Sequence, residues 1–148
     1  MLLYRVCNSA FAGLDGEGAR LYGGRWNSAG IAVVYTATSL ALAVLETRVH
    51  LRKRPIGYVR LTIEIPDSVF EPVVILPGAL DSEWRSKTAI TRGIGDAHFS
   101  RTPLVPLKAP SVVVETEWNV LFSREYAAAQ AAIVEEAPLM MDPRLWND

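Results

Sequence analysis

The chain has 148 residues, of which 50% are hydrophobic and 21% are charged, and its formal net charge is −1. This size favours one domain over residues 1–148, large enough to bury a core without cross-links. The near-neutral charge gives no general attraction to nucleic acid or anionic membranes, and no apolar run is long enough to span a bilayer. The lone cysteine, Cys7, excludes an intrachain disulfide and a cysteine-based zinc cluster, and we expect it to be buried.

Apolar residues that are β-branched or alternate with polar residues predict strands, and apolar residues at helical spacing predict helices. In chain order, the sequence predicts a strand over 2–7, a loop over 9–18, a strand over 31–37, a helix over 39–54, strands over 58–65 and 73–76, a helix over 82–91, strands over 111–115 and 119–122, and a helix over 125–136. We therefore expect an α+β fold with a mostly antiparallel sheet and helices packed on it. No signal-peptide pattern precedes the first strand, so we expect a cytoplasmic protein.

The stretch over residues 20–30 combines charged and aromatic side chains with glycines. Its arginines are Arg20 and Arg25, its aromatic residues are Tyr22 and Trp26, and the strand that follows carries Tyr35. A guanidinium group binds phosphate through paired hydrogen bonds, and aromatic faces accept flat rings. Glycine lets the backbone approach a ligand closely. The stretch therefore predicts a pocket for a small molecule with phosphates and rings, such as a dinucleotide.

The predicted helix over residues 39–54 carries the most informative carboxylate. Thr38 or Ser39 offers an N-cap, and Leu42, Leu45 and Val49 recur at helical spacing, so we expect that side to face the core. Glu46 lies beside this apolar stripe rather than opposite it. From there it is able to reach a cleft between the helix and the sheet, although exposure to solvent is the alternative.

The sequence lacks the residue patterns of several common binding and catalytic sites. The chain contains neither the Gly-x-Gly-x-x-Gly fingerprint nor a phosphate-binding loop that ends in Lys-Ser/Thr. His50 shares a helical face with Glu46, but no third ligand accompanies them and we expect no metal site. The basic run over 48–54 complements the end of a helix, and we expect no direct nucleic-acid binding. Ser111 follows Pro110 without a nucleophile elbow, so we expect a ligand contact or a plain strand-edge serine.

The order of these residues resembles the RES domain, a family named for an arginine, a glutamate and a serine. The matching positions are Arg25 in Gly-Gly-Arg-Trp-Asn, Tyr35 after two valines, Glu46 after a leucine, and Ser111 after a proline. The resemblance covers nearly the whole chain and is most specific in its first half. It implies a fold like that of ADP-ribosyltransferase toxins. It also implies a toxin of a bacterial type II toxin–antitoxin system that uses NAD⁺ as its substrate, without a metal.

Carried over by position, the resemblance implies that Glu46 is the catalytic carboxylate, next to the cation that forms when the nicotinamide bond breaks. Arg25 would bind the phosphates or ribose of NAD⁺, and Tyr35 would stack on or hydrogen-bond the nicotinamide ribose end. These three residues form the expected catalytic set, and Ser111 would line the pocket. The further residues expected to bind NAD⁺ are Arg20, Tyr22, Trp26 and Asn119.

The resemblance also implies a partner, an Xre-like helix-turn-helix antitoxin that covers the active site. ADP-ribose would pass to a protein side chain, to water or to phosphate, and the sequence leaves this choice and a homodimer open. One region departs from the family pattern, because its tyrosine and histidine positions after Asn119 hold Val120 and Tyr126. The rival functions are a non-catalytic nucleotide-binding interaction module and a ribonuclease-type toxin. The charge balance and the lack of a paired acid–base set argue against the ribonuclease.

Overall fold

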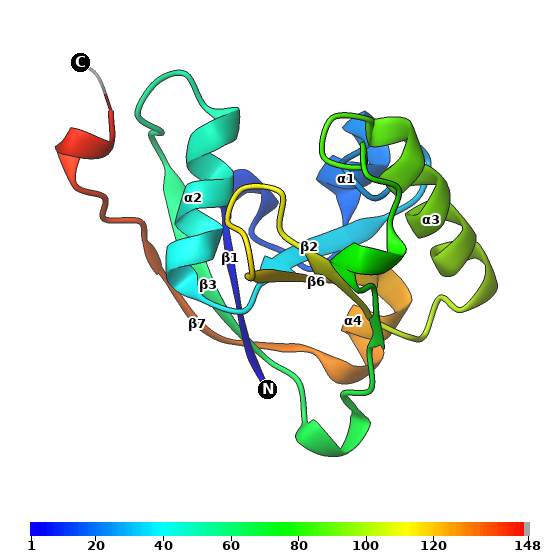
Figure 1. Cartoon of the computed structure of the whole chain (residues 1–148). Coiled ribbons are helices and arrows are strands. Elements are labelled where there is room, and N and C mark those ends of the chain that lie inside the picture. The colour runs from blue at the N-terminus through cyan, green and yellow to red at the C-terminus, as the bar shows by residue number, and fades with distance from the viewer. Residues whose placement is uncertain (147–148) are drawn as a thin grey trace.

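A computed structural model describes residues 1–146 of the chain. Its strands form one seven-stranded sheet in the order β4–β5–β6–β2–β1–β3–β7. The strands are β1 (Leu2–Asn8), β2 (Val33–Ala37), β3 (Tyr58–Glu64), β4 (Val73–Val74), β5 (Leu107–Pro110), β6 (Trp118–Ser123) and β7 (Ala132–Pro138). The helices are α1 (Glu17–Tyr22), α2 (Leu40–His50), α3 (Thr88–Arg101) and α4 (Arg124–Gln130), with short 3₁₀ turns η1 (Ser9–Phe11), η2 (Asp67–Val69), η3 (Pro77–Ala79) and η4 (Pro143–Leu145). Neighbouring strands are antiparallel except β4 and β5, which confirms the predicted α+β class (Figure 1).

One face of the sheet is covered by α4. Alternate residues of β1, β2, β3 and β6 point to this face and form a core with Tyr126 and Ala127 of α4. The sheet residues of this core are Leu3, Cys7, Val34, Leu61, Ile63, Val120 and Phe122. Cys7 is buried, as the sequence predicts, and burial raises the pKa of its thiol.

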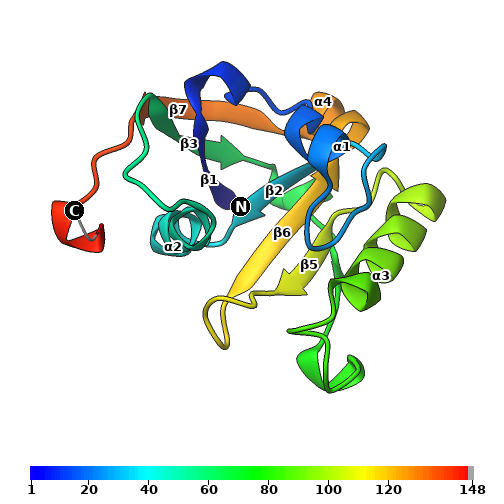
Figure 2. The ribbon, with the colours of Figure 1, turned by 90° about the horizontal axis from the view of Figure 1, so that it is seen from above.

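The opposite face carries both α2 and α3. Leu42 of α2 belongs to a buried cluster with Ala37 of β2, whereas Phe99 of α3 belongs to a cluster with Val33 of the same strand. Val33, Tyr35 and Ala37 alternate along β2, so the two helices lie on the same side of the sheet. Figure 2 shows α2 beside β1 and α3 beside β5, at opposite ends of this face.

Helix α2 differs from its prediction in length and in the side that faces the core. It begins after Ser39, whose hydroxyl accepts the Leu42 N–H at 3.1 Å as a helix cap, but it ends short of residue 54. Leu42 is buried, whereas Leu45 is 38% exposed and Val49 is 57% exposed, so the predicted inward stripe is wrong. The side that faces the sheet instead continues from Leu42 to Glu46, one helical turn later.

Other predicted elements also have different bounds. Turns occupy the first half of the predicted helix over 82–91, whereas α3 begins only at Thr88 and continues past Gly93 and Gly95. The predicted strand over 111–115 is a turn that follows β5, and the predicted helix over 125–136 divides into α4 and the edge strand β7. The alanine-rich composition is overridden because β3 offers a backbone pairing partner to β7.

Beyond β7 the chain turns back beside α2 (Figure 1). The guanidinium carbon of Arg48 lies 4.5 Å from the ring centroid of Trp146, and Arg48 Nε donates to the Leu145 carbonyl at 2.5 Å. The C-terminal segment is therefore attached to the outer part of α2. Within residues 1–146, the structure contains no helix with the length and apolar character needed to cross a membrane.

Candidate active site

The loop between α1 and β2, over residues 23–32, is held along α3 through its main chain. Arg92 Nε donates to the Gly24 carbonyl at 2.8 Å, and Thr91 Oγ1 donates to the Arg25 carbonyl at 2.5 Å. Both donors come from consecutive positions of α3. The backbone on either side of the Arg25 side chain is thereby fixed by side chains distant in sequence.

One turn further along α3, the helix and the loop over residues 23–32 remain in contact. Gly95 has no side chain, and an added Cβ would overlap the Trp26 carbonyl, so the loop backbone approaches α3 directly at this point. Asp96 then accepts both the Ser28 N–H at 2.8 Å and the Ser28 hydroxyl at 2.6 Å. Positions one turn apart on a helix share a face, so a single face of α3 contacts the loop from Gly24 to Ser28.

Tyr35 supports the loop from the sheet. Its hydroxyl donates to Asn27 Oδ1 at 2.6 Å and accepts the Trp26 N–H at 3.0 Å. Burial raises the pKa of Tyr35, while the nearby positive charges of Arg92 and Arg25 act in the opposite direction. The phenol is therefore protonated at neutral pH, and its hydrogen bonds are committed to the loop.

Glu46 and Ser111 form a direct pair between α2 and the end of β5. Ser111 Oγ donates to Glu46 Oε1 at 2.7 Å and accepts the N–H groups of Val113 and Val114, each at 3.1 Å. Ser111 is 1% exposed and Glu46 is partly exposed. Within residues 1–146, Glu46 Oε2 makes no hydrogen bond, so one oxygen is fixed and the other is available to a ligand.

A chain of contacts connects this pair to the Arg25 loop. Arg25 Nη1 donates to the Arg85 carbonyl at 3.3 Å, and Arg85 Nη1 donates to the Val112 carbonyl at 3.4 Å. Val112 directly follows Ser111, which holds Glu46. The structure thus links the predicted arginine to the serine–glutamate pair through Arg85 and Val112, two residues that the sequence analysis did not identify.

Asn119 and Tyr35 lie on the sheet face that carries α2 and α3. In the pairing of β2 with β6, Asn119 is opposite Ala37 and Leu121 is opposite Tyr35. Residues opposite each other in an antiparallel pair point to the same side, so Asn119 and Tyr35 share this face. The Asn119 amide nitrogen donates to the Thr36 carbonyl at 3.3 Å.

The remaining predicted binding residues are placed differently. Arg20 lies on α1 in an ion pair with Glu17, with Nε 2.8 Å from Oε2 and Nη2 2.5 Å from Oε1. Tyr22, at the end of α1, is 80% exposed. Trp26 is 2% exposed and packs against Trp84 at a centroid distance of 6.3 Å. Arg20 is thus occupied by an acid, Tyr22 lies in solvent, and Trp26 belongs to the core.

Sequence reasoning missed the residues that hold the arginine loop in place. These residues are Arg85, Thr91, Arg92 and Asp96. The four were hidden because each acts on a segment about 60 to 70 positions away, as the separations of 60, 66, 68 and 68 residues show. One local signal was present, since Trp84-Arg85 reverses the order of Arg25-Trp26.

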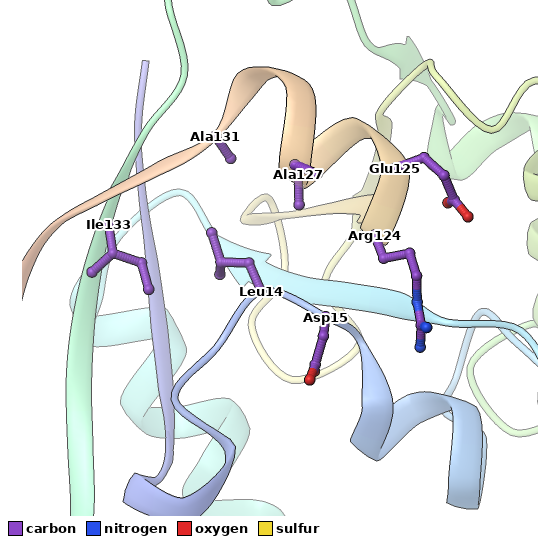
Figure 3. A pocket seen from close by; sticks show the side chains of 8 residues that line it. Leu14, Asp15, Arg124, Glu125, Ala127, Ala131 and Ile133 are labelled. Atoms are coloured by element: carbon purple, nitrogen blue, oxygen red, sulfur yellow. The ribbon is translucent and has the colours of Figure 1, made fainter.

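A pocket of about 680 Å³ lies on the other side of the molecule. It is lined by residues of α4, of β7 and of the segment before α1 (Figure 3). Figure 3 shows Leu14, Ala127 and Ile133 lying toward one another, with Glu125 pointing away. None of the predicted site residues lines this pocket. We base the candidate site on the contacts around Glu46 instead, because those contacts bring chemically capable groups together.

Metal-ligating side chains are dispersed in the part of the chain that the structure describes. Within residues 1–146, no three His, Cys, Asp or Glu side chains converge to hold a metal ion. His50 is exposed at the end of α2, and His98 Nε2 lies 2.8 Å from the Val105 carbonyl.

Comparison with known proteins identifies clear relatives. The family model of the RES domain matches residues 2–144. A "Prs ADP-ribosylating toxin" of Sphingobium sp. (strain YBL2) is 37% identical over 140 residues, which cover 89% of this chain and 86% of that protein. A "Toxin Res" of Pseudomonas putida is 35% identical over 150 residues, which cover 99% of this chain and 100% of that protein.

A solved structure has a similar fold. A chain in the crystal structure of the M. tuberculosis MbcT–MbcA toxin–antitoxin complex matches with a TM-score of 0.76 at 19% sequence identity. The match covers 93% of this chain and 83% of that chain. At this level of identity the similarity establishes a shared fold.

Proposed function

The chain belongs to the RES domain family, and from this premise we propose that it is the toxin of a bacterial type II toxin–antitoxin pair that cleaves NAD⁺ at the nicotinamide glycosidic bond. The names "Toxin Res" and "Prs ADP-ribosylating toxin" of its relatives support this proposal. NAD⁺ is the substrate, and the reaction requires no metal. We place the activity in the cytoplasm, where a bacterium keeps its NAD⁺.

The observation that carries the proposal is the hydrogen bond from buried Ser111 to Glu46, on the sheet face that also bears the Arg25 loop. When the glycosidic bond breaks, its electron pair moves to the nicotinamide nitrogen and neutralises the ring. The ribosyl group is left with oxocarbenium character, as in glycoside hydrolysis. Glu46 stabilises this positive charge, and a group placed in advance for this purpose contributes roughly 3–4 kcal/mol.

The other residues of the site bind and orient the dinucleotide. Arg25 binds its phosphates, because a guanidinium matches phosphate oxygens in charge and geometry. Tyr35 and Asn119 contact the nicotinamide ribose from the sheet. Because the Tyr35 hydroxyl is hydrogen-bonded within the protein, its contribution is the face of its ring. Ser111 acts on Glu46 rather than on the substrate.

The second half of the reaction transfers ADP-ribose to an acceptor. We favour a protein side chain as the acceptor, because the Sphingobium relative is named an ADP-ribosylating toxin. Transfer to water or phosphate needs only access to the same cation, so NAD⁺ degradation is the alternative outcome. In either case a nucleophile bonds to C1′ of the ribose and loses a proton where it carries one.

An unrestrained NAD⁺-consuming enzyme would poison its own cell, so the proposal includes an antitoxin. We propose that an Xre-like helix-turn-helix protein covers the face between α2 and α3 and blocks access to Glu46. The similar fold of a chain in a toxin–antitoxin complex supports a partner of this general kind.

The test measures free nicotinamide after the purified chain is incubated with NAD⁺. We expect release by the native protein and a loss of about a hundredfold or more in Glu46→Gln, because the stabilising charge is removed. Glu115→Gln is the matched control, since Glu115 is an exposed acid on the same turn as Ser111, and it should retain full activity. A folded Glu46→Gln protein with native activity would contradict the proposal.

A second experiment identifies the acceptor by incubating the chain with labelled NAD⁺ and cell lysate, which separates protein modification from hydrolysis. A native protein that releases no nicotinamide favours the alternative function of a non-catalytic nucleotide-binding module.

A further inference from the structure

Two tryptophan–arginine pairs meet beside the candidate site. Trp26 follows Arg25 and Trp84 precedes Arg85, and the two tryptophans are 2% and 4% exposed. Their rings pack with centroids 6.3 Å apart and planes inclined at 38°. Both arginines therefore emerge from one buried aromatic contact, which fixes the backbone from which each side chain starts.

The Arg85 guanidinium is held between this aromatic contact and the turn that follows β5. Its central carbon lies 4.8 Å from the Trp84 ring centroid, within the range of a cation–π interaction. Its Nη1 donates to the Val112 carbonyl at 3.4 Å, next to Ser111. Arg85 therefore stands between Arg25, which contacts its carbonyl, and the Ser111–Glu46 pair.

The charges of these two arginines are not balanced by the protein. Within residues 1–146, neither Arg25 nor Arg85 forms an ion pair. The acid nearest to Arg85 in sequence is Glu83, and it is paired with Lys87. Both guanidinium groups instead contact neutral carbonyl groups over long distances of 3.3 and 3.4 Å. Such contacts are readily exchanged for phosphate oxygens, which form stronger charge-assisted hydrogen bonds.

We propose that Arg85 is a second phosphate-binding residue, which grips the pyrophosphate of the dinucleotide together with Arg25. The inference rests on the proposed function and deepens it by assigning a binding residue outside the arginine, glutamate and serine of the family name. The two negative charges of the pyrophosphate match the two unbalanced guanidinium charges. Because Arg85 also contacts the residue after Ser111, it places the phosphates at a fixed position relative to Glu46.

The test compares the native chain with Arg85→Gln in two measurements, nicotinamide release from NAD⁺ and calorimetric binding of ADP-ribose. We expect KM for NAD⁺ and Kd for ADP-ribose each to rise about tenfold, because one charge-assisted hydrogen-bonding group is lost. We expect kcat to stay within about twofold, because phosphate contacts act in the ground state and the transition state alike. Arg25 keeps its contact in this variant, since that contact is to the main chain of residue 85.

Two further variants make the result decisive. Arg101→Gln removes an exposed arginine at the end of α3 and should leave all values unchanged. Arg85→Lys keeps the charge without the planar fork, and should fall between the native protein and Arg85→Gln; it also carries the test if Arg85→Gln melts early. Native KM and Kd in folded Arg85→Gln would overturn the inference, and so would a loss of kcat alone. If the native chain binds ADP-ribose but releases no nicotinamide, the proposed enzymatic activity is wrong, and the Kd values for ADP-ribose still test the role of Arg85. If the native chain binds no ADP-ribose, the proposed role of Arg85 is overturned.

Discussion

Ser111 illustrates how one hydroxyl group can orient a carboxylate. Its oxygen accepts two main-chain N–H groups, from Val113 and Val114, so its own proton is directed to Glu46. A hydroxyl has one proton and two lone pairs, and all of them are used here. The orientation of Glu46 therefore depends on a turn that is itself closed by the same oxygen.

We expect Ser111→Ala to lower kcat for nicotinamide release about ten- to a hundredfold, because Glu46 loses the group that fixes its orientation. The free energy of unfolding should also fall by about 1–3 kcal/mol, since two turn N–H groups lose their acceptor. Steady-state kinetics and urea denaturation measure the two effects. Ser100→Ala, at an exposed site on α3, is the control. An unchanged kcat in folded Ser111→Ala would show that Glu46 needs no such support.

Among the elements, α3 acts as a template for the loop that carries Arg25. Glycine is a poor helix former, yet Gly93 and Gly95 both lie inside α3. Nothing lies within 4 Å of a Cβ added at Gly93, whereas a Cβ added at Gly95 would overlap the backbone of Trp26. The two glycines therefore have opposite roles although they are separated by a single residue.

We expect Gly95→Ala to destabilise the protein by about 2–3 kcal/mol, because the loop and α3 must separate to admit the methyl group. Gly93→Ala should stabilise it by about 0.5–1 kcal/mol, because alanine is the better helix former at an open site. Urea denaturation gives both values. The KM for NAD⁺ should rise in Gly95→Ala only. Equal stability changes in the two variants would show that the close contact between Gly95 and the Trp26 backbone does not contribute to the free energy of unfolding.

At the scale of the whole molecule, Glu17 joins elements that lie on opposite faces of the sheet. It forms ion pairs with Arg20 of its own helix, α1, and with Arg124 of α4. Ala19 of α1 packs with the α3 side of the sheet, whereas α4 covers the other side. The two hydrogen bonds from Arg20 lower the pKa of Glu17 most, and together with the one from Arg124 they bring it to about 2.

Because this pKa is lower in the folded protein, the ion pairs stabilise the fold fully above the ordinary glutamate value of 4.5, and their contribution is lost as the pH falls towards 2. We expect Glu17→Gln to melt at a lower temperature than the native protein at pH 7. The two melting curves should converge by about pH 2. Glu71→Gln, which changes an exposed acid, is the control. A difference in melting temperature that persists unchanged at low pH would contradict this role.

The sequence predicted β1, β2, β3 and β6 and the family better than it predicted the boundaries of the helices, but it missed β5 and β7. The alternation over residues 58–65 corresponds to β3 because periodicity of two is a local property. The valines after Ser111 suggested a strand, but the Ser111 hydroxyl closes a turn there. The division of residues 125–136 between α4 and β7 depends on pairing with β3, which no local pattern records.

The candidate site was predictable to a similar extent. The positions of Arg25, Glu46 and Ser111 followed from residue types and from the family resemblance, and the structure links Glu46 to Ser111 directly. The role of Arg85 was not predictable, because its contact with Arg25 joins segments that are 60 residues apart. The roles of all the proposed site residues toward NAD⁺, Glu46 and Ser111 included, stay predictions.

Helix α3 grips the Arg25 loop by carbonyl oxygens, namely those of Gly24 and Arg25, and every amino acid possesses a carbonyl oxygen. These two hydrogen bonds therefore do not depend on which side chain occupies position 25, and a substitution there leaves them in place. If Arg25 binds NAD⁺ as proposed, replacing that one side chain should therefore give an inactive protein that keeps its native backbone and serves as a control in experiments.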